Sequence, residues 1–432
     1  MRIRLDIPLS LSEITGGAED ILVNYISTDT REMSAGDLFI PISGRNFNGS
    51  DFISAAKSKG AHVLDTEDGA LMLLKIAGLY KSKLKRLKYT VGITGSVGKT
   101  TAKEFIYKIS SEKYHSHKTL SNENNIIGVA KSILTAPCTT EALILEVGTN
   151  HIGEIKRITD VIPMDIALIT NIGTSHIGNF GSQEAIAREK LCIRRDGITK
   201  LVSRYEDALS GFTFSIKAKD ANLYIEKQME KILIYKNFKL LLKSDCIFSE
   251  KHLLEEVAAA VSVCIAMGID IETLKSGISS LSYDITRQKV IELKKFSVFS
   301  DCYNASLESF TVAFDTISAL ANYPTYSAVV GDIDELSDMS RDIHYRLGAT
   351  MARYNFRRIY LIGYMKNAIK EGYLSSMGRQ DNLVVFNSEF DVYDIADAII
   401  RESREKEIIL FKASRKMRLE VIIDEIKRRC EG

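Results

Sequence analysis

The chain has 432 residues, of which 45% are hydrophobic and 26% charged, a composition ordinary for a globular enzyme of several domains. Its 57 Lys and Arg residues against 56 acidic residues leave no basic field for nucleic acid, and no apolar run is long enough to cross a bilayer. The N-terminus has no signal-peptide pattern and the six cysteines show no CxxC spacing, so we expect a reduced, cytoplasmic protein without a nucleic-acid partner or membrane span.

The first 84 residues predict a small α/β unit. A strand ends in ILVNYISTDT, a second strand follows in GDLFIPISG, and a helix over DFISAAKSKG closes at Gly60 before another strand. The lysine-rich run over residues 81–88 has two interpretations, a solvated helix end or linker and a nucleic-acid patch, and we favour the first.

Strands and helices alternate from Lys88 onward. The runs KYTVGITG, ALILEVG and MDIALITNIG predict buried strands, and TAKEFIYKISSEK and EIKRITDVI predict helices between them. This alternation indicates a parallel sheet covered on both faces. Short alternating strands follow over 197–250, and then a long apolar helix ends at Gly268. The alternation resumes near Tyr283, with helices expected over 306–321, 338–354 and 391–403.

A phosphate loop is the strongest motif. It lies after a strand and before a helix, where backbone N–H groups and the helix N-terminus attract phosphate. We expect Lys99 to reach the β- and γ-phosphates of ATP and Thr100 to hold Mg²⁺. The Walker pattern requires glycine where this chain has Ile93, and the alternative is a tight turn that happens to contain Gly-Lys-Thr. The candidate ATP-binding residues here are Thr94, Gly95, Ser96, Val97, Gly98, Lys99, Thr100 and Thr101.

Seven segments in all parts of the chain extend this motif. The form TGSVGKTT resembles the Mur ligase superfamily, and the other segments resemble its branch that adds D-alanyl-D-alanine to a UDP-muramoyl tripeptide. They are STDTREMSAGDLFIPISGRNFNGSDFISAAKSKGA, SNENNIIGV, LEVGTNHIGEI, ALITNIGTSHIGNFGSQEAIAREK, DCYNASLES, GDIDELS and KASRKMRLE.

The resemblance implies a three-domain α/β fold. The domains are an N-terminal α/β domain for the UDP-substrate (1–84), a central ATP-binding domain with a mostly parallel sheet (85–283) and a Rossmann-like C-terminal domain (284–432). It also implies peptidoglycan synthesis by an ADP-forming ligase, which phosphorylates a carboxylate with ATP before an amine displaces phosphate. We expect a monomer acting on small-molecule substrates.

The resemblance implies two Mg²⁺ ions and a lysine carbamoylated by CO₂. The implied metal ligands are Thr100, Glu146, His176 and carbamoylated Lys190. The implied catalytic residues are Lys99, Lys190, His176 and Asn125. Structural roles for Glu146 and His176, and a salt bridge for Lys190, are the alternatives.

Further binding residues follow from the same resemblance. The substrate residues of the N-terminal domain are Ser27, Thr28, Asp29, Arg31, Gly44, Arg45 and Asn46. Asn122 and Asn124 continue this site in the central domain, although with Asn125 they are equally turn residues. Arg287, Asp301 and Asn304 are implied for ATP, and Asp332, Glu335, Lys412, Ser414 and Arg415 for the incoming amine. Several of these C-terminal residues have loop capping as an alternative.

The chain departs from the family pattern in several places. Where the family has His-Asn-x-x-Asn, this chain has His252-Leu253-Leu254-Glu255-Glu256, and Leu253 offers adenine no hydrogen bond. We find no counterpart of the family's Asn-x-Asp-Asp. Three other motifs differ at Thr286, at Ala413 and over Asn48-Gly49-Ser50, where the family shows Asp-Gly-His.

Three functions therefore remain open. The first is D-Ala-D-Ala addition to a UDP-MurNAc-tripeptide, and the second is a Mur-like ligase for another carboxylate and amine outside cell-wall synthesis. The third is a non-catalytic nucleotide-binding homologue, which the joint presence of Lys99, Thr100, Glu146, His176 and Lys190 disfavours.

Overall fold

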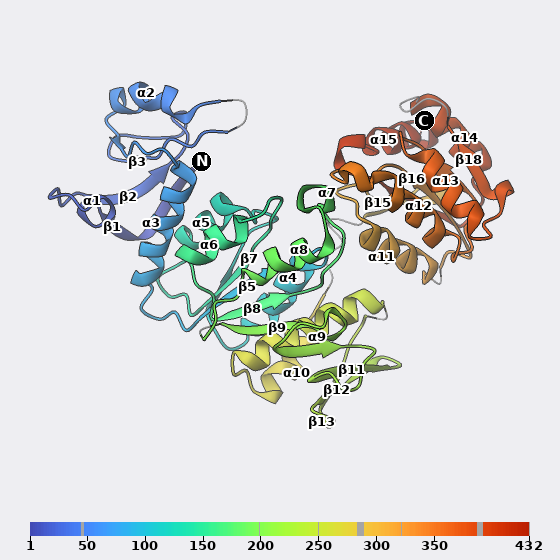
Figure 1. Ribbon diagram of the computed structural model, residues 1–432, viewed down its shortest axis with the longest axis horizontal. Helices are drawn as coiled ribbons and strands as arrows, with labels where there is room; N and C mark the ends of the chain where they lie inside the picture. Colours follow the sequence, from blue (N-terminus) through green and yellow to red (C-terminus); the bar gives the residue numbers. More distant parts are fainter. Residues whose placement is uncertain are drawn as a thin grey trace. The chain divides into compact units, whose positions relative to one another are not determined.

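The structure is a computed structural model, and it describes residues 1–44, 47–197, 199–248, 250–282, 289–320, 322–386 and 392–431 (Figure 1). Within these ranges the strands form sheets of four, nine and six strands, which confirms the predicted α/β fold class. Contacts divide the chain into two compact units, Met1–Ile172 with Ala187–Leu281 and Gly173–Ile186 with Ser282–Gly432. The domain boundaries drawn from the sequence stay predictions.

The N-terminal sheet has the order β1-β2-β3-β4. Its first pair is antiparallel and the other pairs are parallel. The strands are β1 (Arg2–Ser10), β2 (Leu22–Ser27), β3 (Leu38–Phe39) and β4 (His62–Val63). The helices are α1 (Leu11–Thr15), α2 (Ile53–Ser58) and α3 (Gly69–Lys83). Asp68 is the N-cap of α3, since its carboxylate accepts a hydrogen bond from the N–H of Leu71 at 3.0 Å.

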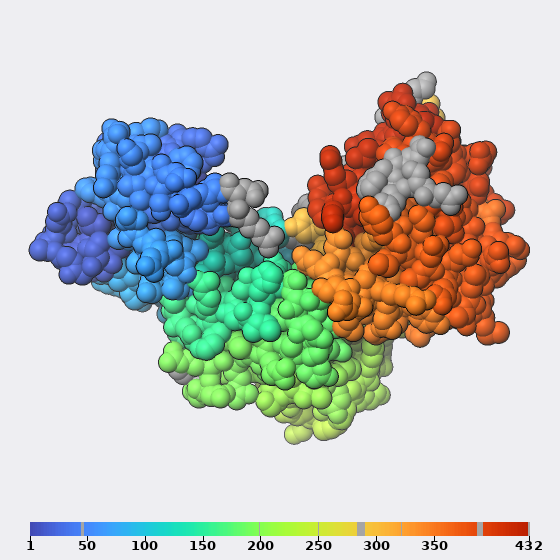
Figure 2. Space-filling view, turned by 45° about the horizontal axis from the view of Figure 1, so that its top comes forward, coloured from blue at the N-terminus to red at the C-terminus, as the bar shows by residue number. Residues whose placement is uncertain are grey.

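Helix α3 packs against α5 (Ile126–Leu134) of the next sheet. Tyr80 of α3 is fully buried there, and its hydroxyl donates to the carbonyl of Ala136 at 2.7 Å. One hydrophobic core includes Leu73 of α3 and Ile133 of α5. Figure 2 shows the blue N-terminal residues meeting the teal residues that follow them. This shared core explains why the first two sheets form one compact unit.

The central sheet has the order β13-β12-β11-β10-β9-β8-β5-β7-β6. It is parallel from β6 to β11, and β12 and β13 join it antiparallel. The strands are β5 (Tyr89–Thr94), β6 (Ser116–Lys118), β7 (Ala142–Glu146), β8 (Ile166–Ile169), β9 (Lys200–Arg204), β10 (Phe212–Ser215), β11 (Leu223–Gln228), β12 (Lys231–Lys236) and β13 (Lys239–Asp245). Strands β7 and β8 are buried along their whole length, as their continuous apolar sequences predict.

The remaining helices of this unit connect and cover these strands. They are α4 (Lys99–Ser110), α6 (Glu154–Val161), α8 (Gln183–Leu191), α9 (Lys251–Ala266) and α10 (Ile271–Ser279). The predictions of α4, α6 and α9 are confirmed to within about a turn. Strand β1 and helices α3 and α5 were not predicted.

The C-terminal sheet has the order β14-β15-β19-β16-β17-β18, with all neighbours parallel except the first pair. Its strands are β14 (Lys289–Glu292), β15 (Phe296–Asp301), β16 (Thr325–Val330), β17 (Ile359–Leu361), β18 (Leu383–Val385) and β19 (Glu407–Lys412). The helices are α11 (Leu307–Ser318), α12 (Ser340–Met351), α13 (Lys366–Ser375), α14 (Val392–Glu402) and α15 (Glu420–Glu431). Helices α14 and α15 share one core with β15 and β19. The predicted helices over 306–321, 338–354 and 391–403 correspond to α11, α12 and α14, although residues 321 and 391 lie outside the described ranges.

All six cysteines are free thiols. Within the described ranges, no helix is both long enough and apolar enough to cross a membrane.

Two glycines let the backbones of α12 and α13 touch. A Cβ on Gly348 would lie 1.9 Å from the carbonyl oxygen of Ile369, and a Cβ on Gly372 would lie 1.9 Å from that of Tyr345. These obstacles are backbone atoms, which do not move aside as a flexible side chain would.

We therefore expect Gly348→Ala to lower the free energy of unfolding by about 1–3 kcal/mol, because the new methyl group forces α12 and α13 apart. Urea denaturation followed by circular dichroism measures this change. The control is Arg346→Ala on the exposed face of α12, which we expect to stay within about 0.5 kcal/mol of wild type. Equal stability of wild type and Gly348→Ala would show that the helix contact is loose.

Candidate active site

The phosphate loop joins the end of β5 to the start of α4. Lys99 is the first residue of α4, and its Nζ donates to the carbonyl of Gly95 at 2.6 Å and to that of Ser96 at 3.3 Å. The predicted nucleotide motif thus has the strand, turn and helix that phosphate binding requires. The loop carbonyls hold the Lys99 ammonium where bound phosphate would compete for it.

Thr170 and Asn171, which directly follow β8, hydrogen-bond to this loop. The Asn171 side chain accepts from the N–H of Val97 and donates to the carbonyl of Val97, both at 3.1 Å. The Thr170 hydroxyl donates to the same carbonyl at 2.6 Å. Sequence reasoning missed both residues. The end of the predicted strand in ALITNIG could have indicated them, because the neighbouring parallel strand β5 ends beside it at the phosphate loop.

Thr100 and Glu146 meet beside the loop. The Thr100 hydroxyl donates to Glu146 Oε2 at 3.0 Å, and Asn124 donates to Glu146 Oε1 at 3.0 Å. Glu146 ends β7 and is 1% exposed, and the buried Lys103 ammonium lies 3.6 Å from its Oε2. The structure therefore brings together three residues that sequence reasoning proposed for the metal and substrate sites.

Thr100 and Glu146 fit one Mg²⁺ by their chemistry. A hydroxyl and a carboxylate are hard oxygen ligands, and Mg²⁺ binds through few protein ligands together with nucleotide phosphates. Within the described ranges no group of three or more His, Cys, Asp or Glu side chains forms a metal cage. A site completed by phosphate oxygens agrees with this finding.

Lys190, on α8, is 4% exposed. Burial, together with the nearby positive charge of Lys99, lowers the pKa of Lys190 to about 7 against the opposing effect of Glu189. Glu189 is itself engaged, because it accepts hydrogen bonds from the N–H groups of Gly153 and Ile155 at the start of α6. Lys190 therefore has an accessible neutral amine form near pH 7, which an ordinary surface lysine lacks.

The three asparagines of the loop before α5 have different roles. Asn124 holds Glu146, as described above. Asn125 caps α5, with its side-chain oxygen accepting from the N–H of Gly128 at 2.9 Å. Asn122 accepts from Ser121 at 3.2 Å. The cap gives Asn125 a structural role in this conformation, and its catalytic role stays a prediction.

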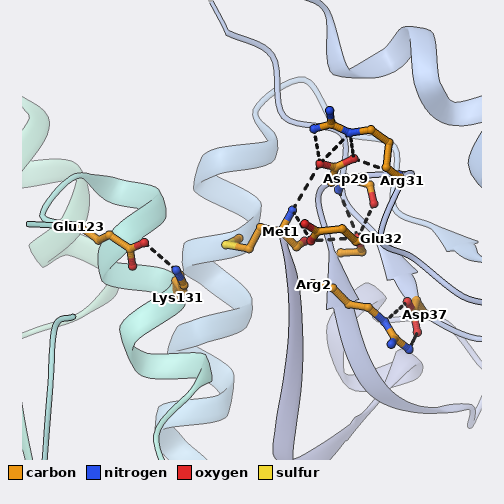
Figure 3. A network of polar contacts seen from close by, with 9 residues as sticks. Met1, Arg2, Asp29, Arg31, Glu32, Asp37, Glu123 and Lys131 are labelled. Carbon is orange, nitrogen blue, oxygen red and sulfur yellow. Dashed lines mark hydrogen bonds and ion pairs between the residues drawn. The ribbon is translucent and has the colours of Figure 1, made fainter. Parts of the chain in front are cut away.

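Asp29 organises the predicted N-terminal substrate loop (Figure 3). Its carboxylate accepts three side-chain hydrogen bonds from Arg31, at 2.6, 2.9 and 3.2 Å, and lies 3.8 Å from the Met1 amino group. The Arg31 guanidinium holds the pKa of Asp29 well below its usual range. Ser27 donates to the carbonyl of Asp29 at 2.9 Å, and the N–H of Thr28 donates to that of Met1 at 2.9 Å. The four predicted residues 27, 28, 29 and 31 thus form one ordered loop with an exposed guanidinium.

The structure describes only part of the second predicted substrate loop, Gly44, Arg45 and Asn46. Arg45 and Asn46 lie outside the described residues, and Gly44 donates from its N–H to the carbonyl of Phe47 at 3.0 Å. Asn48, at one of the departures from the family, accepts from the N–H of Ser50 at 3.1 Å and from Ser43 at 2.8 Å. Asn48 therefore serves as a cap for the short helix that follows.

In the second unit, Lys412 hydrogen-bonds to two residues predicted to bind ATP, Asp301 and Asn304. Its Nζ, at the end of β19, donates to Asp301 Oδ2 at 2.7 Å and to the carbonyl of Asn304 at 3.0 Å. Lys412 is 1% exposed, so this pair fixes the loop after β15. Arg287, the third residue predicted for ATP from this part of the chain, lies outside the described residues.

A cavity of about 270 Å³ lies in the second unit. Asp332, which precedes the lining residue Ile333 in the chain, accepts hydrogen bonds from the N–H groups of Tyr364 and Met365 at 2.8 and 3.0 Å, so it stabilises a turn in this conformation. Ser414 Oγ accepts from the N–H of Asp334 at 2.8 Å. The predicted residues among those lining the cavity are His176, Asn304, Glu335, Ser414 and Arg415.

His176 and Glu335 form an ion pair in this unit, and both have left-handed backbone conformations. The segment Gly173–Ile186 belongs to this unit by its contacts, and Glu308 accepts from the N–H of Thr174 at 2.7 Å. Sequence reasoning missed Glu308. The metal-binding role of His176 stays a prediction.

A charged cluster at the end of β9 was also missed. The strand ends at Arg204, and the short turn Tyr205–Asp207 that follows it carries the acids Glu206 and Asp207. Arg204 donates to Asp207 at 2.8 Å, and Asp207 accepts from the N–H of Ile172 at 3.2 Å. Two acids directly after an apolar strand were the available signal. Leu253, in the family's adenine-binding position, is buried in α9.

Comparisons with known proteins agree with this geometry. The family model for the Mur ligase family catalytic domain matches residues 22–86, and that for the Mur ligase middle domain matches residues 93–231. The UDP-N-acetylmuramoyl-tripeptide--D-alanyl-D-alanine ligase of Bacillus subtilis is 30% identical over 94% of each chain. The chain belongs to the Mur ligase family. The predicted ligase class is confirmed by this membership.

Two solved structures share the fold. MurF from Acinetobacter baumannii superposes with a TM-score of 0.83 at 24% identity, covering 99% of this chain and all of that one. MurF from Thermotoga maritima, solved with ADP, gives a TM-score of 0.78 at 25% identity and covers 94% of this chain and 97% of that one. The resemblance inferred from sequence motifs is thus confirmed at the level of the fold.

Lys99→Ala should leave a folded protein whose turnover falls by well over tenfold, because the phosphate loop loses its cation for the transferring phosphate. ATP-dependent phosphate release measures this loss, and Lys108→Ala on the exposed end of α4 is the matched control. Turnover of Lys99→Ala within about tenfold of wild type, or roughly 1.4 kcal/mol, would remove Lys99 from the mechanism.

Proposed function

We propose that this protein adds D-Ala-D-Ala to a UDP-MurNAc-tripeptide, using ATP to activate the tripeptide carboxylate. The observation that carries the proposal is the braced phosphate loop with Thr100 and Glu146 in hydrogen-bond contact beside it. The names of the relatives in Bacillus subtilis and Buchnera aphidicola, aligned over nearly the whole chain, give the substrate pair. Cytoplasmic location and a monomeric state stay predictions.

Activation is the step that the first unit serves. The N-terminus of α4 and the N–H groups of the loop bind the nucleotide phosphates, and Lys99 exchanges the Gly95 carbonyl for a phosphate oxygen. Thr100 and Glu146 would hold Mg²⁺, which neutralises phosphate charge when bound. The γ-phosphate then passes to the carboxylate oxygen with release of ADP. Little covalent help is needed, because phosphoryl transfer depends mainly on positioning and positive charge.

Amide formation follows from this activation. The neutral amine nitrogen attacks the acyl carbon, a tetrahedral intermediate forms, and phosphate leaves with the bonding electrons while the nitrogen loses one proton. We assign the loop of Ser27, Thr28, Asp29 and Arg31 to the uridine nucleotide, with the exposed Arg31 guanidinium as its cation. We assign the cavity of the second unit to the incoming dipeptide, because it presents Glu335 to an amine and Arg415 to a carboxylate.

A second candidate function has a specific observation in its favour. The family's Asp-Gly-His is replaced by Asn48-Gly49-Ser50, and Asn48 is used as a helix cap. A loop altered in this way favours a ligase for a different carboxylate. The conserved chemistry of the phosphate loop is the same in both candidates.

Phosphate release with UDP-MurNAc-tripeptide, D-Ala-D-Ala and Mg²⁺-ATP tests the proposal. We expect release only when both substrates are present, and a product larger than the tripeptide by one dipeptide in mass spectrometry. The Lys99→Ala protein, purified in parallel, controls for contaminating ATPases. Release only with other carboxylates would favour the second candidate, and no release with any acceptor would favour a non-catalytic homologue.

We further propose that Lys190 is carbamoylated in the active enzyme. Its neutral amine attacks the carbon of CO₂, a nitrogen–carbon bond forms, and one proton is lost to solvent, so a neutral amine becomes an anion. The low pKa of Lys190, about 7, supports this step because the neutral amine is the nucleophile. A carbamate supplies two anionic oxygens, which are hard ligands for a second Mg²⁺.

We expect Lys190→Ala to lose most activity and added acetate to restore part of it by supplying the missing carboxylate. Removing bicarbonate should slow the wild type but leave the variant unchanged. Turnover assays in CO₂-free buffer measure both effects, with Arg188→Ala on the exposed face of α8 as control. Normal turnover of Lys190→Ala in CO₂-free buffer would leave Lys190 with only a structural charge.

A further inference from the structure

Glu256, on α9, lies directly against the phosphate loop. A Cβ built on Gly98 would be 1.7 Å from Glu256 Oε1, so the carboxyl group occupies the space that any larger residue at position 98 would need. Gly98 has a left-handed conformation (φ 84°) and is the N-cap residue directly before α4. The side chain of Glu256 is therefore aimed at the turn where the nucleotide phosphates bind.

This carboxyl group is buried and incompletely bonded. Glu256 is 8% exposed, and its Oε2 atom is buried without a hydrogen-bond partner. Buried polar atoms nearly always have a partner, and an exception in a binding site marks an atom that a ligand completes. The nearby Glu255 differs, since it lies 3.8 Å from Lys217 and 3.9 Å from Arg204.

The charges around Glu256 do not stabilise an anion. Among the described residues, Glu255 opposes ionisation of Glu256, and Arg204 and Lys99 favour it. Arg204 is already bound to Asp207 at 2.8 Å, and Lys99 donates to the carbonyl of Gly95 at 2.6 Å. Burial is the largest influence and raises the pKa of Glu256 well above its usual range. Burial and the charge of Glu255 therefore favour the neutral carboxyl group, which carries one O–H.

We propose that Glu256 is a nucleotide-binding residue whose neutral carboxyl group donates its O–H to a phosphate oxygen held beside Gly98. The inference rests on the ATP dependence of the proposed function. An ionised carboxylate at this position would repel the phosphates, whereas a carboxylic acid supplies a donor.

Proton linkage follows from this chemistry. Above the pKa of Glu256 in the free protein, binding of the nucleotide must first restore the O–H, so affinity falls by about tenfold for each further pH unit. Below that pKa, affinity does not depend on this group. Glu256→Gln keeps an N–H donor that does not titrate, and therefore removes the dependence.

Binding of ADP with Mg²⁺, without a carboxylate substrate, tests the inference. Isothermal titration calorimetry from pH 7.5 to 9.5 compares wild type with Glu256→Gln and Glu256→Ala. We expect the Ala variant to bind about tenfold more weakly than wild type at pH 7.5 and the Gln variant to bind within about threefold of it. We also expect wild-type affinity to fall below that of the Gln variant as the pH rises.

The matched control is Glu255→Gln, which removes a carboxylate from the same helix without touching the contact with Gly98. We expect it to keep the fall of affinity with pH. Difference infrared spectra provide a measurement on the wild type alone, in which ADP binding should shift a protonated-carboxyl C=O band that Glu256→Gln lacks.

Coincident pH profiles of wild type and Glu256→Gln, undiminished binding by Glu256→Ala, or no protonated-carboxyl band in the wild type would each overturn the inference. Because the ligand is ADP alone, these outcomes are separate from the phosphate-release test of the substrate pair. ADP binding without proton linkage overturns the role of Glu256 only. Proton linkage with no ligase activity overturns the proposed substrates only.

Discussion

The hydrogen bonds between Asn171 and Val97 are the constraint on which the site depends. They join the loop after β5 to the end of β8, its neighbour in the sheet, and so hold the phosphate loop open before a nucleotide arrives. A preformed loop does not spend binding energy on ordering itself. The functional side chains near it, Thr100 and Glu146, follow from the same geometry, because the carboxyl ends of parallel strands lie along one edge of the sheet.

Much of this arrangement was predictable from local sequence. The phosphate loop, the alternation of buried strands with helices, and Glu146 at the end of ALILE are all encoded in short segments whose patterns have direct physical meaning. The same holds for α4 and α9, whose apolar residues recur with helical spacing. These predictions succeeded because a few neighbouring residues decide each of them.

Contacts between distant segments were not predictable in this way. The strand end in ALITNIG indicates that Asn171 lies near the phosphate loop, but the sequence does not identify Val97 as its partner. It likewise does not identify Gly98 as the neighbour of Glu256. Neighbouring asparagines were also hard to assign from sequence, since Asn124 hydrogen-bonds to Glu146 while Asn125, next to it, caps a helix. Residue type alone does not separate these tasks. Helix α3 escaped prediction for a related reason, because its apolar residues cover more than one face and give only a weak helical pattern.

The core that α3 shares with α5 has a consequence for how such enzymes diversify. Tyr80 and Leu73 are buried in one core with residues of α5 such as Ile133, so a cut between residues 84 and 85 would leave an apolar surface on both fragments. Recombination that exchanges the substrate-binding segment must therefore carry a matching α5 face with it. New carboxylate specificities are reached more readily by changing loops such as the one around Asn48, which lies outside this core, than by replacing the N-terminal segment as a module.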